Sequence, residues 1–388
     1  MGINTEVVAG SADDFMLVRH LRVTGTQTEI GRALAEEAYE RGGWRPMAAD
    51  PVRNRARLAW FERYWPQHRA RMEGAAAVLG TTVESARVYL DEVATVPGGS
   101  ACTATWCAPS ATREGHGFLG RNYDFFTVGW EQLFAMISGE RAEDDGSLPA
   151  AARPYVITSV PDDAPATTLI TMNELDGCME GINEHGLAVA LLIADMETAG
   201  EPSDAGPQVG IGSAQLPRFV LDTCENVEQA QRALLGAKQY DLGTPLHYLI
   251  ADRHGDAFVW ETGPGGSEYI VPADGEALCV TNHLLHKRHD PGNAPADNDE
   301  TVRSYERLET IRDRTKSGPM SAGAVRDALD EVAFDSRNAG AYPVRTLWRT
   351  VFDLDERSMT THFFLGDEPD GTNRYSEEVV FRPGGHAA

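Results

Sequence analysis

The spacing of hydrophobic residues along the chain changes close to residue 100. Before that point, apolar residues recur at helical spacing over 28–41, from Asp50 to about residue 79, and over 83–92, after one strand-like run at 15–23. Asp50 followed by Pro51 is a helix-start signal, and Pro66 should divide the long helix in two. The pattern predicts that the first hundred residues are mainly helical.

Beyond residue 101, apolar runs of strand length alternate with pairs of segments at helical spacing. Strands are predicted at 103–108, 117–126, 132–138, 154–159, 167–173, 187–193, 246–252, 257–262, 277–281, 346–354, 359–365 and 378–381. Helices are predicted at 217–224, 226–237, 299–314 and 322–333, and the polar, acidic residues 139–153 should form a surface loop. This order predicts an α+β fold in which sheets pack face to face between helical layers.

The charge and the cysteine content narrow the range of functions. The 388-residue chain has a net charge of −25 and a pI near 4.8, which argues against nucleic acid and anionic membranes as partners. Its five cysteines form no CxxC pair, which argues against a disulfide framework or a zinc site, so we predict no metal and no cofactor. The first residues lack a signal-peptide pattern and no apolar run could span a bilayer, so we expect a cytoplasmic protein.

Cys102 is the strongest candidate for chemistry. It follows the small residues Gly98-Gly99-Ser100-Ala101 and precedes the polar stretch Gly120-Arg121-Asn122-Tyr123-Asp124-Phe125. Such a thiol can attack the carbonyl of Ala101, and if that bond breaks, Cys102 becomes a chain terminus. Its α-amine, with an ordinary pKa of about 8, can then act as the base for its own thiol. Arg121 and Asp124 would hold the amine and the thiol in place.

Six segments with characteristic spacing occur in order along the chain. They are Ala101 to Thr103, Gly120 to Phe125, Gly181 to Val189, Pro245 to Asp252, Val280 to His283 and Ser304 to Arg307. Together they resemble the cysteine N-terminal nucleophile (Ntn) hydrolases, most closely the isopenicillin N acyltransferase-like group, which is related to the choloylglycine hydrolases and the acid amidases. Two positions depart from the pattern. Ala101 stands where the group most often has glycine, and Ile193 aligns with an oxyanion-binding asparagine of the bile-salt hydrolases.

The resemblance implies a four-layer αββα sandwich of the Ntn-hydrolase type with a helical N-terminal segment. Residues 1–101 would be a propeptide or small α subunit, and residues 102–388 the catalytic β subunit. The two fragments would stay associated after cleavage between Ala101 and Cys102, because they would share one core. A homo-oligomer is left open.

The resemblance also assigns roles to single residues. Cys102 would be the nucleophile, Arg121 would favour its thiolate, Asp124 would hold the amine or thiol, and Asn282 would donate a hydrogen bond to the oxyanion. Two further residues are candidates for substrate binding. Asn122 either contacts the substrate or supports the site, and Arg307 either binds a substrate carboxylate or braces a helix.

The expected function is an autoproteolytically activated amidohydrolase that cleaves a linear amide of a small N-acylated substrate through a thioester. One alternative is an acyltransferase that moves an acyl group from acyl-CoA or an amide to an amine. Another is an uncleaved binding protein without catalytic activity. A third is a papain-like Cys–His enzyme, in which His185 or His247 would be the base. His283, His286 and His289 lie close in sequence but lack the carboxylates of a metal site.

Overall fold

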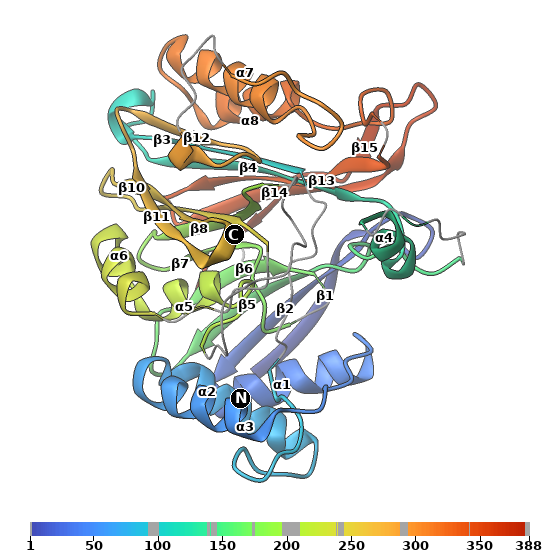
Figure 1. Ribbon diagram of the computed structural model, residues 1–388, viewed down its shortest axis with the longest axis vertical. Coiled ribbons are helices and arrows are strands. Elements are labelled where there is room, and N and C mark those ends of the chain that lie inside the picture. The colour runs from blue at the N-terminus through green and yellow to red at the C-terminus, as the bar shows by residue number, and fades with distance from the viewer. Residues whose placement is uncertain are drawn as a thin grey trace.

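The computed structural model describes residues 2–91, 101–137, 140, 146–172, 175–195, 210–237, 239, 244–287, 294–340 and 342–384. Two β-sheets stack face to face, and helices cover the outer face of each sheet (Figure 1). The four-layer αββα arrangement predicted from the sequence is confirmed. Among the described residues, none of the helices has the length and apolar character needed to cross a membrane.

The larger sheet has nine strands in the described part of the chain, in the order β1-β2-β5-β6-β7-β8-β9-β10-β11. Their bounds are β1 (Gly2–Gly10), β2 (Leu17–Gly25), β5 (Tyr155–Pro161), β6 (Thr167–Thr171), β7 (Glu180–Asn183), β8 (Ala188–Ile193), β9 (Leu246–Ala251), β10 (Ala257–Thr262) and β11 (Glu268–Pro272). β2 and β5 run parallel, and the other neighbouring strands run antiparallel.

The smaller sheet has seven strands in the described residues, in the order β12-β3-β4-β13-β14-β15, with β16 also paired to β14. Their bounds are β12 (Ala277–Val280), β3 (Ala101–Cys107), β4 (Phe118–Phe126), β13 (Val344–Asp353), β14 (Ser358–Asp367), β15 (Asn373–Tyr375) and β16 (Val379–Phe381). Cys102 is the second residue of β3, which lies between β12 and β4. It therefore sits within a sheet and not on a surface loop.

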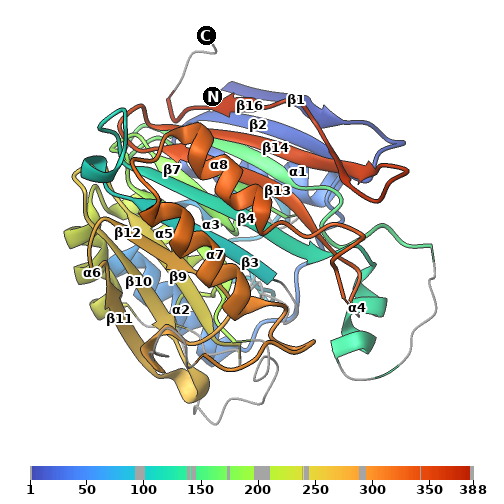
Figure 2. The same cartoon turned by 90° about the horizontal axis from the view of Figure 1, so that it is seen from above.

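The helices divide between the two outer layers. α7 (Ser304–Lys316) and α8 (Ala322–Glu331) pack on the seven-stranded sheet, as Figure 2 shows from above. α1 (Gln27–Glu40), α5 (Leu216–Thr223) and α6 (Val227–Gly236) contact the nine-stranded sheet. α3 (Pro66–Val78) packs on α1, and α2 (Pro51–Tyr64) packs on α3. α4 (Trp130–Ile137) lies to one side. Three short 3₁₀ turns are η1 (Pro109–Ala111), η2 (Pro264–Gly266) and η3 (Leu285–Lys287).

Local sequence signals explain where the N-terminal helices begin and end. Thr26 and Glu29 form a reciprocal capping box at the start of α1. Asp50 caps α2 through the backbone N–H of Arg53, and Pro66 starts α3. The predicted break of the long helix at Pro66 is confirmed.

Two glycines allow α1 and α3 to pack with their backbones in contact. A Cβ atom at Gly31 would lie 2.1 Å from the carbonyl oxygen of Arg71, and one at Gly74 would lie 2.1 Å from that of Thr28. Any side chain at these positions would push the two helices apart.

The N-terminal segment is less helical than the sequence pattern indicated. Besides the strand expected near 15–23, residues 2–10 form β1, which pairs with β2 at the edge of the larger sheet. β1 is mostly exposed, so its sequence lacks the apolar alternation of a half-buried strand. Residues on both sides of Ala101 therefore belong to one sheet, since β2 precedes the proposed cleavage site and its partner β5 follows it.

Two further predictions of secondary structure are wrong. The described part of 83–92 forms turns instead of a helix, because Thr82 and Ser85 bond each other's backbone N–H and Tyr89 N–H donates to Met47. Residues 132–138 were expected as a strand, but α4 spans most of them. Apolar residues there are so dense that their spacing does not separate a strand from a helix.

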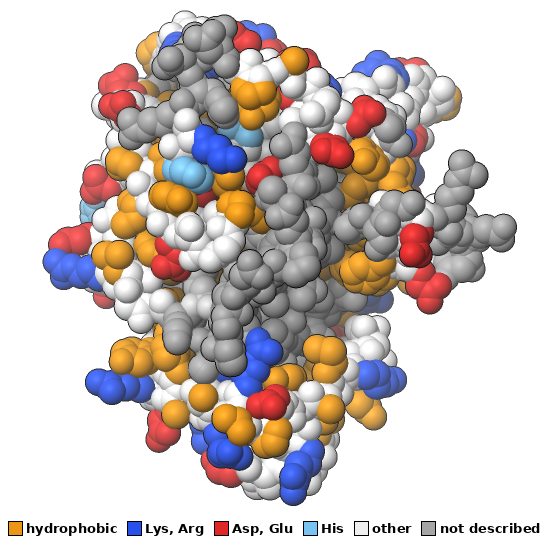
Figure 3. All heavy atoms as spheres, in the orientation of Figure 1, with side chains coloured by type: hydrophobic (Ala, Val, Ile, Leu, Met, Phe, Trp, Pro, Cys, Tyr) orange, Lys and Arg blue, Asp and Glu red, His pale blue; other side chains and the backbone are white. Residues whose placement is uncertain are grey.

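Acidic and basic side chains are interspersed over the described part of the face in Figure 3. Several Lys and Arg side chains lie at its lower end, where Figure 1 places α2 and α3. The excess of negative charge is thus not concentrated in one patch on this face.

Candidate active site

The thiol of Cys102 is buried between strands that carry the predicted polar residues. Cys102 pairs with Tyr123 of β4, so Arg121 and Tyr123 share its face of the sheet. Nη2 of Arg121 lies 3.5 Å from Sγ of Cys102. Burial raises the pKa of the thiol, the charge of Arg121 lowers it, and burial prevails. The thiol therefore stays protonated at neutral pH.

The guanidinium of Arg121 joins the two sheets. It forms an ion pair with Glu180 of β7 and donates to the main-chain oxygen of Leu191 in β8. Burial alone would lower the pKa of Arg121, but the Glu180 carboxylate holds it above its usual value. Sequence reasoning missed Glu180. The one sequence feature that could have pointed to Glu180 is its position as a single acidic residue between Met179 and Gly181, directly before the segment from Gly181 to Val189.

Asp124 lies opposite Ala101 across the β3–β4 pair, next to the expected cleavage site. Its Oδ1 accepts a hydrogen bond of 2.5 Å from the hydroxyl of Thr346, and its buried Oδ2 has no partner among the described residues. Burial raises the pKa of Asp124 to about 6, although Arg307 and Thr346 act in the opposite direction.

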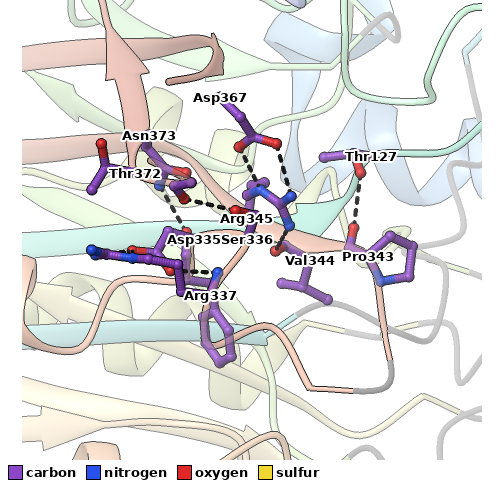
Figure 4. A network of polar contacts seen from close by, with 12 residues as sticks. Thr127, Asp335, Ser336, Arg337, Pro343, Val344, Arg345, Asp367, Thr372 and Asn373 are labelled. Atoms are coloured by element: carbon purple, nitrogen blue, oxygen red, sulfur yellow. Dashed lines mark hydrogen bonds and ion pairs between the residues drawn. The ribbon is translucent and has the colours of Figure 1, made fainter. Parts of the chain in front are cut away.

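Thr346 is itself held by a polar network. Its hydroxyl accepts from the N–H of Phe334, and the carbonyl of Phe334 accepts from the amide of Asn373 in β15. Figure 4 shows this region, in which Arg345 and Asp367 also form an ion pair of 2.8 Å. The hairpin of β14 and β15 therefore helps to fix the carboxyl group of Asp124.

Asn282 lies just beyond the end of β12, and its side chain faces the backbone of Cys102. Its Oδ1 accepts from the backbone nitrogen of Cys102 at 2.8 Å, and its Nδ2 donates to the carbonyl of Ile193 at 2.7 Å. The N–H of Asn282 donates to Oγ of Ser304 at 2.7 Å. The side chain thus links Cys102 in one sheet to β8 in the other.

Arg307 braces the same residues from α7. Its Nη1 donates to the carbonyl oxygen of Cys102 at 2.6 Å, and its Nη2 donates to Oδ1 of Asn282 at 2.7 Å. Its Nε donates to the carbonyl of Val302 at 3.1 Å. The guanidinium is fully buried and contacts the protein's own backbone, so of the two roles left open the structure favours bracing over substrate binding.

The backbone that leads into α7 is strained. Val302 and Arg303 adopt the left-handed conformation, with φ of 51° and 57°. For a β-branched residue such as Val302 this conformation is an outlier. These two residues precede Ser304 and Arg307, which both form hydrogen bonds with Asn282. A strained backbone persists only where surrounding contacts stabilise it.

The side chain of Asn122 faces α8 and Arg349 instead of the thiol of Cys102. Its amide donates to the carbonyl of Leu329 in α8 at 2.7 Å and accepts from Nε of Arg349 at 2.9 Å. The side chains of Asn122 and Asp124 both lie on the face of the sheet opposite the thiol of Cys102, because side chains alternate along a strand. Of the two roles left open for Asn122, these contacts favour support of the site, because they attach α8 to β4.

The structure shows where the competing histidines lie. His247 contacts Glu261 and the carbonyl of Thr281, and the hydrogen-bond partners of Cys102 within the described residues include no histidine. His185 is partly exposed, at the turn between β7 and β8. A papain-like arrangement is therefore not seen. His289 and the small residues 98–100 lie outside the described residues.

Comparisons with known proteins identify the family. The profile of the acyl-coenzyme A:6-aminopenicillanic acid acyl-transferase family matches residues 111–364, which begins after Cys102 and includes Arg121, Asp124, Asn282 and Arg307. A search of curated proteins gave no match.

Several solved structures are similar in part. Penicillin V acylase from Agrobacterium tumefaciens is 19% identical, with 68% of this chain and 83% of that chain covered and a TM-score of 0.44. A mutant of conjugated bile acid hydrolase from Clostridium perfringens is 15% identical, with coverage of 72% and 96% and a TM-score of 0.46. An N-acylethanolamine-hydrolyzing acid amidase from Caenorhabditis elegans is 13% identical, with coverage of 65% and 93% and a TM-score of 0.40. The family profile covers well over half of the chain, which therefore belongs to the acyl-coenzyme A:6-aminopenicillanic acid acyl-transferase family.

Proposed function

We propose that the protein is a self-cleaving cysteine amidohydrolase, in which Cys102 becomes the N-terminal residue of a catalytic fragment. The observation that supports this most directly is the contact between the backbone nitrogen of Cys102 and Oδ1 of Asn282, at 2.8 Å. Cleavage would convert that nitrogen into an α-amine. Asn282 would then hold a base that lies on the same residue as the nucleophilic thiol.

Self-cleavage would start with attack of Sγ of Cys102 on the carbonyl carbon of Ala101. The C–N bond of the peptide breaks, the nitrogen takes up the thiol proton, and the acyl group moves to sulfur as a thioester. Water then hydrolyses the thioester, which leaves Ala101 with a carboxylate and Cys102 with a free amine and thiol. Alanine is small enough to leave its carbonyl open to this attack.

In turnover the α-amine would take the thiol proton, and the thiolate would attack the amide carbonyl of an N-acylated substrate. The side-chain amide of Asn282, whose Nδ2 donates to Ile193 in the uncleaved chain, would donate to the developing oxyanion. The ammonium would return its proton to the leaving amine. The buried carboxylate of Asp124, on the strand next to Cys102, would be the acceptor for that ammonium.

Residues 1–101 would remain bound after cleavage. Asp222 of α5 accepts a hydrogen bond from Arg71 at 2.5 Å and from the indole of Trp65 at 3.0 Å. β2 also pairs with β5 along seven residue positions. The proposal therefore predicts two chains in one particle, as an α and a β subunit.

Acyl transfer is the second candidate, and the matching family profile supports it. Both reactions share the thioester on Cys102 and differ in whether water or an amine attacks it. Incubation with linear N-acyl amides of graded chain length, with and without hydroxylamine, separates the two. Acid release alone indicates hydrolysis, whereas a hydroxamate yield that rises with the nucleophile indicates transfer. The absence of an acyl adduct on Cys102 with every amide and with acyl-CoA would contradict both.

A further inference from the structure

A buried carboxylate on β10 gathers hydrogen bonds from two separate segments near the active site. Glu261 is fully buried, and its carboxylate accepts from Nε2 of His247 at 2.6 Å and from the N–H of Leu285 at 2.5 Å. The N–H and Nδ1 of His286 also donate to it. Leu285 and His286 belong to η3, which follows Asn282 by only a few residues. Glu261 therefore fixes the segment 281–287 against the nine-stranded sheet.

His247 also contacts Thr281, the residue before Asn282. Its Nδ1 lies 3.1 Å from the carbonyl oxygen of Thr281. A carbonyl can only accept, so Nδ1 carries a hydrogen and donates it. The opposite nitrogen of the ring contacts Glu261, which prevents the ring from turning. This bond connects β9 of the larger sheet to the end of β12 in the smaller one.

Burial by itself would raise the pKa of Glu261. The hydrogen bonds and charge of His247 and the donors of η3 outweigh it and lower this pKa to about 2. The carboxylate is therefore ionised at neutral pH and draws both His247 and η3 toward it.

We propose that His247 and Glu261 are positioning residues, which orient the peptide at Thr281 and thereby aim the amide of Asn282 at Cys102. This inference rests on the proposed function, because it assumes that Asn282 acts on the acyl group attached to Cys102. Neither residue contacts the reacting atoms in the described structure. A displacement of about 1 Å at such a site can lower a rate by about 100-fold.

Two reactions of the cleaved enzyme separate positioning from general damage. Acylation of Cys102 by p-nitrophenyl acetate passes through an oxyanion and depends on Asn282. Alkylation by iodoacetamide forms no oxyanion and depends only on the thiolate. Both rates can be measured in a single turnover, with the site of modification identified by peptide mass.

His247→Asn and His247→Gln form a matched pair. Asparagine can place an amide N–H where Nδ1 stands and keep the bond to Thr281, whereas glutamine reaches toward Glu261 and loses that bond. We expect His247→Gln to slow acylation at least about 10-fold with alkylation nearly unchanged, and His247→Asn to slow acylation less. Glu261→Gln should behave like His247→Gln. His254→Gln, in the exposed turn between β9 and β10, is the control.

Equal acylation rates in His247→Gln, Glu261→Gln and wild type would overturn the inference. So would a parallel loss of acylation and alkylation in these variants, because that result indicates damage to the whole site. If a His247 variant does not fold, the ratio of the acylation rate to the alkylation rate in Glu261→Gln tests the inference by itself. Failure of the wild type to acylate or alkylate at Cys102 would instead contradict the proposed function.

Discussion

The backbone nitrogen of Cys102 lies 2.8 Å from Oδ1 of Asn282, although 180 residues separate the two in sequence. Arg307 donates to the same Oδ1 and to the carbonyl of Cys102. The three residues come from β3, from the end of β12 and from α7. This arrangement brings the side-chain amide of Asn282 next to Cys102, which holds both the thiol and the nitrogen that cleavage would release.

Replacement of Asn282 by alanine should slow acylation of Cys102 by about 100- to 1,000-fold, the usual effect of removing one oxyanion donor. It should also slow self-cleavage, because the same side chain holds the nitrogen of the scissile bond. Single-turnover acylation and the rate of chain cleavage measure the two effects. Asn226→Ala, which removes the N-cap of α6, is a control that should cost stability but leave both rates unchanged. Unchanged acylation in Asn282→Ala would show that the oxyanion is held elsewhere.

Arg307→Lys should slow both self-cleavage and turnover for every substrate. A lysine ammonium cannot reproduce the planar set of bonds to Cys102, Thr103 and Asn282. Steady-state kinetics with paired substrates, one of which bears a carboxylate, test this expectation. A rise in KM confined to the carboxylate-bearing substrate would instead identify Arg307 as a substrate-binding residue.

The buried pair of Arg121 and Glu180 should serve reactivity more than stability. Glu180→Gln leaves the guanidinium without its counter-charge, which should cost about 3–5 kcal/mol of unfolding free energy. Arg121→Met combined with Glu180→Met should recover most of that stability but alkylate at Cys102 more slowly, because the thiolate loses its positive neighbour. Urea unfolding and iodoacetamide kinetics measure the two quantities. Full alkylation activity in the double variant would contradict the role of Arg121.

The raised pKa of Asp124 predicts a pH dependence of stability in the uncleaved chain. Its folded-state pKa of about 6 exceeds the ordinary 3.8, so between these values the folded protein binds more protons than the unfolded one. The free energy of unfolding should therefore fall as pH rises from about 4 to about 6, by about 3 kcal/mol, and then level off. Urea unfolding of Cys102→Ala, with and without Asp124→Asn, isolates this contribution. Identical pH profiles for the two variants would refute it.

Much of the fold could be predicted from local sequence. Pro66 divides α2 from α3, and apolar runs of strand length mark β9 and β10. β1 escaped prediction because it is an exposed edge strand, and α4 because apolar residues fill most of its positions. Both failures have the same cause. The spacing of hydrophobic residues identifies an element only when one of its faces is buried and the other is exposed, and neither β1 nor α4 has such a pattern.

The site was predictable only where the chain carries a motif. Arg121 contacts the thiol of Cys102 and Asn282 contacts its backbone nitrogen, whereas the side chain of Asp124 lies on the other face of β4; the catalytic roles of these residues stay predictions. The motif left the role of Asn122 open, because adjacent residues on a strand point to opposite faces and the motif does not say which face is used. The roles of Glu180 and Thr346 depend on contacts across 59 and 222 residues, which no local pattern reports.

Intact-protein mass spectrometry under denaturing conditions, on the wild type and on Cys102→Ala, tests the central claim most directly. The account predicts two wild-type fragments that meet at Ala101 and Cys102, and a single full-length chain for the variant. Under native conditions the two wild-type fragments should migrate as one particle. A wild-type chain that stays whole would leave Cys102 without a free α-amine and would contradict the proposed mechanism.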